Sequence, residues 1–243
     1  MATTPAHAAG AASVLVTNTD AQSGTLTNGY TYTTSTGGAP IAFVQVKAAT
    51  PQTASASVAV TYTTAQTAGN LNVVVVGWND TTSTVTAVTD SRGNSYALAI
   101  GPTSGTGLRQ SIYYAKNIAA GSNTVTVKFN QAAAFVDIRA LEYSGLDTVS
   151  PLDVTAGAAG SGTTGNSGTA TTTSANELIV GVGMTATKFT QAGTGFTLRT
   201  ITSPDADIAE DKGTTAAGSY NATGTTSPGS PWVMQMATFR AAP

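Results

Sequence analysis

The stretch "LNVVVVGW", residues 71–78, decides the fold class. Its four consecutive valines, Val73 to Val76, fill both alternating positions of an extended chain, so both faces of such a strand are apolar. Valine is β-branched and favours strands. A strand that is apolar on both faces is typical of the middle of a structure, where other layers cover both of its sides. The stretch therefore predicts a central strand.

Shorter segments of the same kind occur on both sides of this strand. "SVAVTYT" (57–63) and "NTVTVKF" (123–129) alternate between apolar and polar residues, so each is expected to have one solvated face. Strands separated by turn residues every 8 to 14 residues or so are typical of a sandwich or barrel. We therefore predict an all-β fold, a jelly-roll-like antiparallel β-sandwich, with strands at 13–18, 29–34, 41–47, 57–63, 72–78, 84–89, 95–100, 109–115, 123–129, 136–143, 168–173, 177–184, 196–201, 207–212 and 232–239.

The larger part of the chain has two halves with similar sequence patterns, residues 41–156 and 168–241. "AGNLNVVVVGW" (68–78) parallels "SANELIVGVGM" (174–184), and "VDIRALEYSG" (136–145) closes its half as "VMQMATFRAA" (233–242) closes the other. "GAAGSGTTGNSGT" (157–169), rich in Gly, Ser and Thr, is predicted to be a connector between them. Internal duplication and shared strand composition both remain open as explanations.

Composition excludes several classes of function. Charged residues are 9% of the chain, against about 25% in an ordinary domain, and the net charge is −2. Without a Lys/Arg cluster, neither nucleic acid nor an anionic membrane is an expected partner. The absence of cysteine excludes disulfides and thiolate metal sites. The beginning, "MATTPAHAAG", lacks the apolar region of a signal peptide, and no apolar run is long enough to insert into a membrane.

The single histidine, His7, limits the available catalysis, because a Ser-His-Asp triad or a His-ligated metal would need it. No nucleophile elbow, P-loop or dinucleotide motif occurs in the sequence. We interpret His7 as a loop residue.

Carboxylate chemistry remains. "SPDADIAEDK" (203–212) contains Asp205, Asp207, Glu210 and Asp211, which we consider as a calcium site because Ca²⁺ takes oxygen ligands. A solvated acidic turn is the alternative. A pair of carboxylates can also hydrolyse a glycoside, and Glu142 or the 205–211 cluster would supply it.

Three aromatic residues are candidate ligand-binding residues, because sugar rings stack on exposed aromatic faces. Trp78 and Trp232 are expected at the ends of the sandwich, where loops form binding sites, with core packing as the alternative for both. Tyr114 follows Tyr113 on a predicted strand, so one of the two is expected to point outward.

The first residues, "TTPAHAAGAASVLVTNTDAQSGTLTNGYTY", resemble the C-terminal part of an IPT/TIG domain, an immunoglobulin-like module of bacterial surface and secreted proteins. The resemblance covers residues 1–36 and only the last strands of such a module. Residues 37–243 form the second predicted domain. Within it, "VVVVGWNDTT", "VTDSRGNSY", "SIYYAKNIAAGSNTVTV", "LEYSGLD" and "MQMATFRAA" resemble a β-sandwich domain of large secreted soil bacterial proteins. The resemblance implies an extracellular location, with the signal in a longer parent chain.

Three functions follow as expectations. The first is a non-catalytic binding or adhesive module for a polysaccharide or cell-surface glycan, motivated by the modular resemblance, the hydroxyl-rich composition and the tryptophans. The second is a structural, self-assembling subunit, in which the partial first module pairs with another copy by strand addition. The third is a carboxylate-dependent polysaccharide hydrolase.

Overall fold

The computed structural model describes residues 10–32 and 38–243. This part of the chain contains strands and turns and no helix, and every strand pairing is antiparallel, so the all-β prediction is confirmed. It accordingly contains no helix able to span a membrane. The chain divides into two compact units, one up to Gly38 and one over Ala39–Ala242.

The first unit contains a hairpin of β1 (Gly10–Thr17) and β2 (Ser23–Tyr32). Thr17 lies opposite Ser23 at the turn, and their side-chain oxygens are 2.8 Å apart. The second strand begins earlier than the predicted range 29–34, because backbone pairing extends to the turn at Ser23.

The second unit begins with eight strands that we call the first repeat, residues 42–144. Five of them form a sheet in the order β3-β10-β5-β8-β7, and three form a second sheet in the order β4-β9-β6. The strands are β3 (Ala42–Ala49), β4 (Ser55–Thr61), β5 (Leu71–Trp78), β6 (Val85–Asp90), β7 (Ala97–Ser104), β8 (Arg109–Ala115), β9 (Thr124–Ala133) and β10 (Asp137–Ser144).

Eight further strands form the second repeat, residues 152–240. Its main sheet has the order β11-β18-β13-β16-β15, with β14 also paired to β18, and β12 pairs with β17. The strands are β11 (Leu152–Asn166), β12 (Ala170–Thr171), β13 (Glu177–Thr185), β14 (Phe189–Ala192), β15 (Thr197–Ile201), β16 (Ile208–Gly213), β17 (Ser219–Tyr220) and β18 (Thr223–Arg240).

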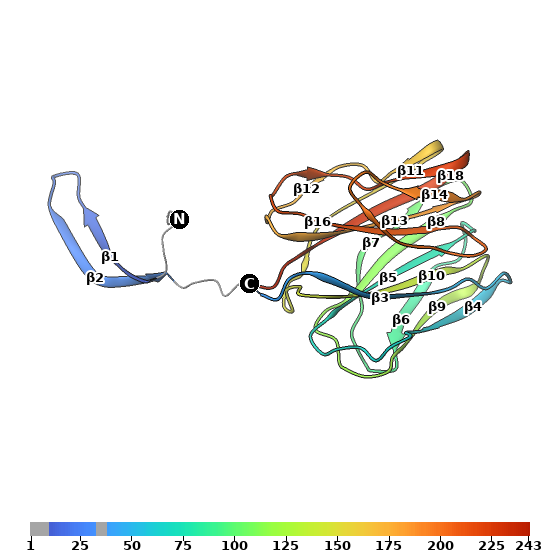
Figure 1. Cartoon of the computed structure of the whole chain (residues 1–243), viewed down its shortest axis with the longest axis horizontal. Coiled ribbons are helices and arrows are strands. Elements are labelled where there is room, and N and C mark those ends of the chain that lie inside the picture. Colours follow the sequence, from blue (N-terminus) through green and yellow to red (C-terminus); the bar gives the residue numbers. More distant parts are fainter. Residues whose placement is uncertain (1–9, 33–37) are drawn as a thin grey trace. The chain divides into compact units, whose positions relative to one another are not determined.

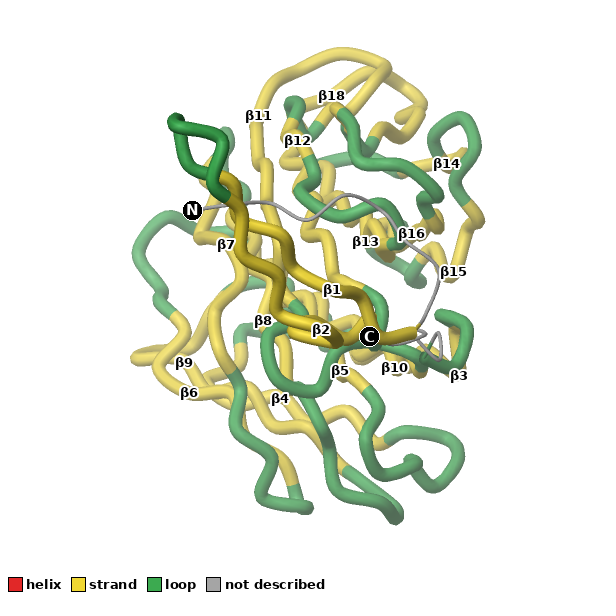
Figure 2. Tube along the Cα trace, turned by 90° about the vertical axis from the view of Figure 1, so that its left-hand side faces the viewer, coloured by secondary structure: helices red, strands yellow, loops and turns green. Residues whose placement is uncertain are grey.

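The two repeats have the same strand order. In each main sheet the first strand of the repeat lies beside the eighth, followed by the third, sixth and fifth, and in each small sheet the second strand pairs with the seventh. This is the order of a jelly-roll-like sandwich built twice. Figure 1 shows the second unit as stacked sheets, and Figure 2 shows the β4-β9-β6 sheet and the second repeat at opposite ends of it.

The central layer is the main sheet of the first repeat, and the "LNVVVVGW" strand β5 lies in its middle. Val74, Val76 and Trp78 pack toward the β4-β9-β6 sheet, whereas Val73 and Val75 pack against the main sheet of the second repeat. All eight residues of β5 are buried. Both faces of this strand are apolar because each is covered by another sheet.

The interface between the repeats also contains a polar network around Arg139. This side chain is fully buried, and its Nε lies 2.8 Å from Asp137 Oδ1 in the same strand. Its Nη1 donates hydrogen bonds to the carbonyl oxygens of Gly183, at 2.9 Å, and Ile208, at 2.5 Å, both in the second repeat. Nη2 donates to Gln110 Oε1 at 3.0 Å. The guanidinium group therefore links the main sheets of the two repeats.

One prediction about the chain between the halves is wrong. The predicted connector 157–169 lies mostly in β11, a strand that pairs along nearly its whole length with β18. Two of its glycines are explained by close approaches. A Cβ atom on Gly157 would lie 2.7 Å from Thr103 Oγ1, and one on Gly160 would lie 2.5 Å from the Trp232 ring. The composition of residues 157–169 predicted a linker, whereas in the structure the glycines make room for neighbouring side chains.

Candidate functional site

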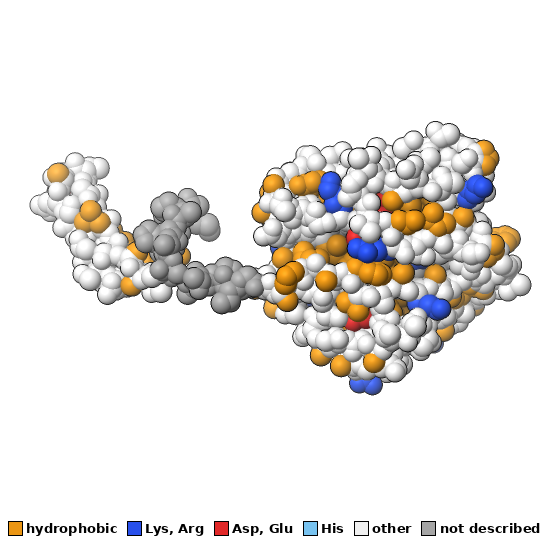
Figure 3. All heavy atoms as spheres, viewed as in Figure 1, with side chains coloured by type: hydrophobic (Ala, Val, Ile, Leu, Met, Phe, Trp, Pro, Cys, Tyr) orange, Lys and Arg blue, Asp and Glu red, His pale blue; other side chains and the backbone are white. Residues whose placement is uncertain are grey.

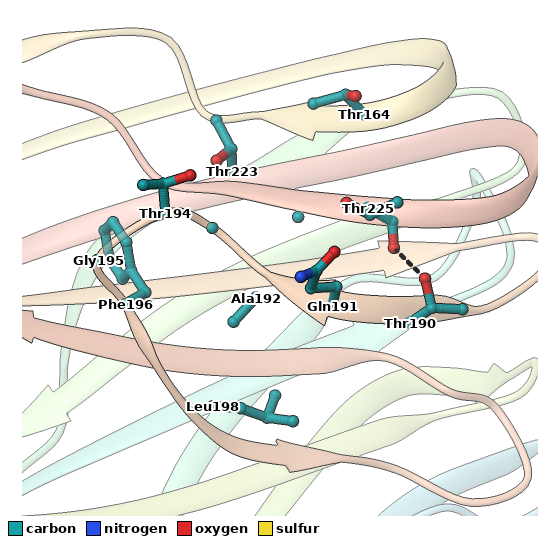
Figure 4. Close-up of a pocket in the computed structure, with 12 residues that line it drawn as sticks. Thr164, Thr190, Gln191, Ala192, Thr194, Gly195, Phe196, Leu198, Thr223 and Thr225 are labelled. Carbon is teal, nitrogen blue, oxygen red and sulfur yellow. Dashed lines mark hydrogen bonds between the residues drawn. The ribbon is translucent and has the colours of Figure 1, made fainter.

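The second repeat contains an open groove of about 640 Å³, which we call the threonine groove. Strands β11, β14, β15 and β18 and the loop between β14 and β15 contribute its walls, as the labelled side chains in Figure 4 show. Five threonines line it together with Gln191, three glycines, Ala192, Phe196 and Leu198; the threonines are Thr164, Thr190, Thr194, Thr223 and Thr225.

Strand register builds a polar row across the groove. Thr225 of β18 lies opposite Thr164 of β11 on one side and opposite Gln191 of β14 on the other. Residues that are directly opposite in neighbouring strands project on the same face, and these three side chains are exposed. Thr190 Oγ1 donates to the Thr225 carbonyl oxygen at 3.3 Å and helps to hold β14 beside β18 (Figure 4). The row therefore presents hydroxyl and amide groups at strand spacing.

Phe189 fixes β14, the strand on which the groove depends. Its ring is 2% exposed and is enclosed by three glycines from three strands. A Cβ atom would approach the ring to 3.3 Å at Gly165, 2.6 Å at Gly183 and 2.8 Å at Gly224. Thus the alternation of Thr and Gly in β11 and β18 places threonines in the groove and glycines against Phe189.

Glu210 lies behind the groove wall and holds the loop between β14 and β15. Its carboxyl group is fully buried, and Oε2 accepts a hydrogen bond from the Gly193 amide at 2.7 Å. Burial raises the pKa of Glu210 to about 7, although the amides of Gly193 and Thr223 act in the opposite direction. Near neutral pH the group is therefore divided between its two protonation states.

Among the described residues, no acidic or basic side chain lines the threonine groove. Its polar groups are hydroxyls, one amide and backbone, and its apolar surface includes Phe196 and Leu198. Hydroxyl and amide groups both donate and accept hydrogen bonds, and an aromatic ring provides an apolar face. The groove can accordingly bind a neutral polyhydroxylated chain without removing charges from water.

The predicted aromatic residues lie elsewhere. Trp78 is 1% exposed and packs edge-to-face with Phe129 in the core. Trp232 is 9% exposed, and its ring lies over Gly160. Tyr114 is half-buried and packs edge-to-face with Phe239. For both tryptophans the structure shows the core alternative, because their rings are covered.

The four residues of the predicted calcium site do not come together. Glu210 and Asp211 are neighbours on β16, so they point to opposite faces: Glu210 toward Gly193, and Asp211 into an ion pair with Arg199 at 2.7 Å. Asp205 and Asp207 line a separate cavity of about 230 Å³. Within the described ranges no group of three or more His, Cys, Asp or Glu residues is placed to hold a metal ion.

Asp205 and Asp207 have structural partners of their own. Gln52 Nε2 donates to Asp205 Oδ1 at 2.8 Å, and the Thr185 amide donates to Asp207 Oδ1 at 3.0 Å. Burial, with the nearby charge of Asp137, raises the pKa of Asp207 well above the usual range of an aspartate. Burial therefore favours the protonated form of Asp207.

Glu142, the residue considered for hydrolysis, is fully buried and accepts three hydrogen bonds. The donors are Gln45 Nε2 at 2.6 Å, Asn70 Nδ2 at 2.7 Å and the Thr67 amide at 3.2 Å. Such a carboxylate holds strands and turns together and has no access to a polymer. His7 lies outside the described residues.

Sequence reasoning missed the groove because its residues come from three distant stretches, "GSGTTGN" (160–166), "FTQAGTGFTL" (189–198) and "NATGTTSPGS" (221–230). The sequence does not show which of these stretches are neighbours in space. The available signal was the alternation of Thr with Gly around Thr164 and Thr225, which marks a strand with one polar and one tightly packed face.

In comparisons with protein-family models, with the curated proteins and with solved structures, no match to this chain was found.

Proposed function

We propose that this chain is a non-catalytic binding module for a polysaccharide, of the kind carried by larger secreted bacterial proteins, and that it holds the polymer in the threonine groove. The row Thr164, Thr225 and Gln191 carries the proposal. Its hydroxyl and amide groups match sugar hydroxyls, and the open groove allows a chain to pass through it.

The surface around the groove supports the same assignment. In Figure 3 the visible face of the second unit is mainly neither apolar nor charged, and the basic groups occur singly. A hydroxyl-rich, weakly charged surface gives little electrostatic attraction for nucleic acid. Among the carboxylates considered for hydrolysis, Glu142 accepts hydrogen bonds from Gln45 and Asn70, and Asp211 is paired with Arg199. These contacts favour binding over catalysis.

Retention on insoluble plant, fungal and bacterial polysaccharides, followed by calorimetry with soluble oligosaccharides, tests the proposal. Thr225→Val keeps the side-chain shape and removes one hydroxyl, and Gln191→Ala removes the neighbouring amide. Each is expected to weaken binding about five- to tenfold, the effect of losing about one hydrogen bond.

Thr89→Val is the matched control, because Thr89 is an exposed threonine on β6, in the other repeat. It should leave binding unchanged. Absence of retention on every polysaccharide, or retention that Thr225→Val and Gln191→Ala leave unchanged, would overturn the proposal.

A second candidate function, self-assembly, is favoured by the β1–β2 hairpin. Leu15 is 63% exposed, Val16 62% and Leu26 64%, and two strands alone are marginally stable in water. We propose that the hairpin pairs with another copy of the chain, in keeping with the predicted IPT/TIG likeness of residues 1–36.

Light scattering at two concentrations tests this proposal. A stable oligomer is expected, and the double variant Val14→Ser with Leu26→Ser, a cross-strand pair, should dissociate it. A monomeric wild-type chain would contradict it.

A further inference from the structure

The threonine groove adjoins a second cavity, and the two differ in charge. Gly195 lines both. The second cavity has a volume of about 280 Å³ and is lined in part by Arg199, Asp211 and Lys212. A chain that follows the groove past Gly195 therefore leaves a neutral surface and meets charged groups.

Lys212 lies at this junction. Its Nζ is 5.9 Å from the ring centroid of Phe196, which lines the groove, and 5.7 Å from that of Tyr220. A Cβ atom on Gly195 would lie 3.5 Å from Nζ. The two rings hold the half-buried side chain in place, so the ammonium group is positioned before any ligand arrives.

This ammonium group has no ionic partner within the described ranges. The ion pairs there are Arg139–Asp137, Arg199–Asp211 and Arg240–Asp153. Arg199 binds Asp211 with two nitrogens, at 2.7 and 2.9 Å, so these two charges balance each other. Lys212 therefore leaves one unbalanced positive charge at the junction.

Glu210, two residues before Lys212 on β16, does not supply the missing charge. Glu210 points toward the Gly193 amide, and its pKa is raised to about 7 by burial. In mildly acidic solution it is mostly uncharged. A half-buried ammonium group without a carboxylate is a favourable place for an anion from the ligand.

We propose that the polysaccharide is acidic, and that a carboxylate on its sugar units binds Lys212 Nζ while neighbouring hydroxyl groups bind the threonine row. This inference rests on the proposed function and names the ligand class of the same site. A sulfated sugar offers the same anionic chemistry, and the experiment separates the two.

The test compares each acidic polymer with its own neutral derivative. Polygalacturonate and alginate are measured beside their methyl esters, and carrageenan beside agarose, by affinity electrophoresis and calorimetry at a pH of about 6, below the pKa of Glu210. The wild-type chain should bind at least one carboxylated polymer about five- to tenfold more tightly than its ester, and about 1 M salt should reduce this preference.

Substitutions at Lys212 test whether this side chain causes the preference for the acidic polymer over its ester. Lys212→Gln should remove the preference and leave binding of the ester unchanged, whereas Lys212→Arg should retain it. Lys128→Gln on β9 is the control, because Lys128 is an exposed lysine of the other repeat. If Lys212 only packs against the two rings, Lys212→Gln will weaken acid and ester binding equally.

The outcomes separate the two proposals. Ester bound as tightly as acid overturns the acidic ligand, and a preference that survives Lys212→Gln overturns the role of Lys212; polysaccharide binding stands in both cases. A preference for carrageenan over all carboxylated polymers overturns the carboxylate in favour of sulfate. Binding to none of the polymers, charged or neutral, overturns both proposals.

Discussion

The first and second repeats share a strand order but complete it differently. In the first repeat, the fourth strand, β6, joins β9 and gives the small sheet three strands. In the second repeat, the small sheet consists of β12 and β17, two residues each, and the fourth strand, β14, pairs with β18 of the main sheet instead. The threonine groove lies beside β14, where this strand pairs with β18.

The comparison shows that the same strand order can enclose an apolar core in the first repeat and leave an open groove in the second. In the first repeat, the space between two complete sheets is filled by side chains that include Trp78, Phe129, Val74 and Val76. In the second repeat, Gly181 and Gly183 of β13 leave room for Ala222 and Phe189 to approach the main sheet directly. The smaller covering sheet leaves an open groove beside it.

Removing the charge that joins the repeats should have the largest effect. Arg139→Met keeps most of the side-chain volume and leaves Asp137 buried without its cation. We expect a loss of about 3–5 kcal/mol in the free energy of unfolding, measured by urea denaturation. Lys128→Met, at an exposed basic residue, is the control and should change stability little. Equal stability of the two variants would show that the repeats do not depend on Arg139.

The variants Phe189→Ala and Phe129→Ala compare the loss of a buried ring in the second repeat with the same loss in the first. Both remove a buried ring and should cost about 3 kcal/mol or more in urea denaturation. Only Phe189→Ala should also weaken polysaccharide binding, because its ring holds β14 against the glycines of β11, β13 and β18. Equal binding by both variants would mean that the groove forms without this anchor.

Glu210→Gln tests the buried carboxyl group behind the groove. Its pKa is raised from 4.5 to about 7, so between these values the folded chain keeps a proton that the unfolded chain loses, and stability falls as pH rises. Glutamine cannot ionise. Wild type and variant should be similar near pH 4, and near pH 8 the variant should be more stable, by as much as about 3 kcal/mol.

Glu142→Gln is the corresponding variant in the first repeat. Its carboxylate accepts hydrogen bonds from Gln45, Asn70 and the Thr67 amide. Glutamine would place an NH₂ group against these donors, so the variant should be less stable than wild type near pH 8. For Glu210→Gln, a change in stability of the same size near pH 4 and near pH 8 would show that the pKa of Glu210 is not raised in the folded chain.

Two glycine substitutions should show the smallest contrast. A Cβ atom on Gly183 would lie 2.6 Å from the Phe189 ring and 2.7 Å from Met234 Sδ, whereas one on Gly77 would meet Met184 at 3.4 Å. Gly183→Ala should cost about 1–2 kcal/mol, and Gly77→Ala should be close to neutral. Thermal unfolding measures both. A costly Gly77→Ala would indicate that the central layer is the tighter of the two.

Much of the fold follows from local patterns. The valine run predicted a strand buried on both faces, and alternation with turn residues predicted most of the remaining strands, though not β11, β14 or β17. The likeness of residues 68–78 to 174–184 pointed to strands that occupy the same place in each repeat. This likeness did not predict which sheet the side chains of each strand face. Val74 and Val76 face the small sheet of their repeat, whereas the aligned Val180 and Val182 face the other repeat. A shift of one residue reverses every side chain of a strand.

The sequence by itself determined that the protein is all-β, weakly charged and free of cysteine chemistry, because propensity, alternation and composition are local properties. Only the tertiary structure decided that β11 is a strand, that the tryptophan rings are covered and that the acids of 205–211 point to different places. It also brought Thr164, Gln191 and Thr225 into one row. These features depend on which distant strands pair and which layer covers each face, and both are settled by burial across the whole fold.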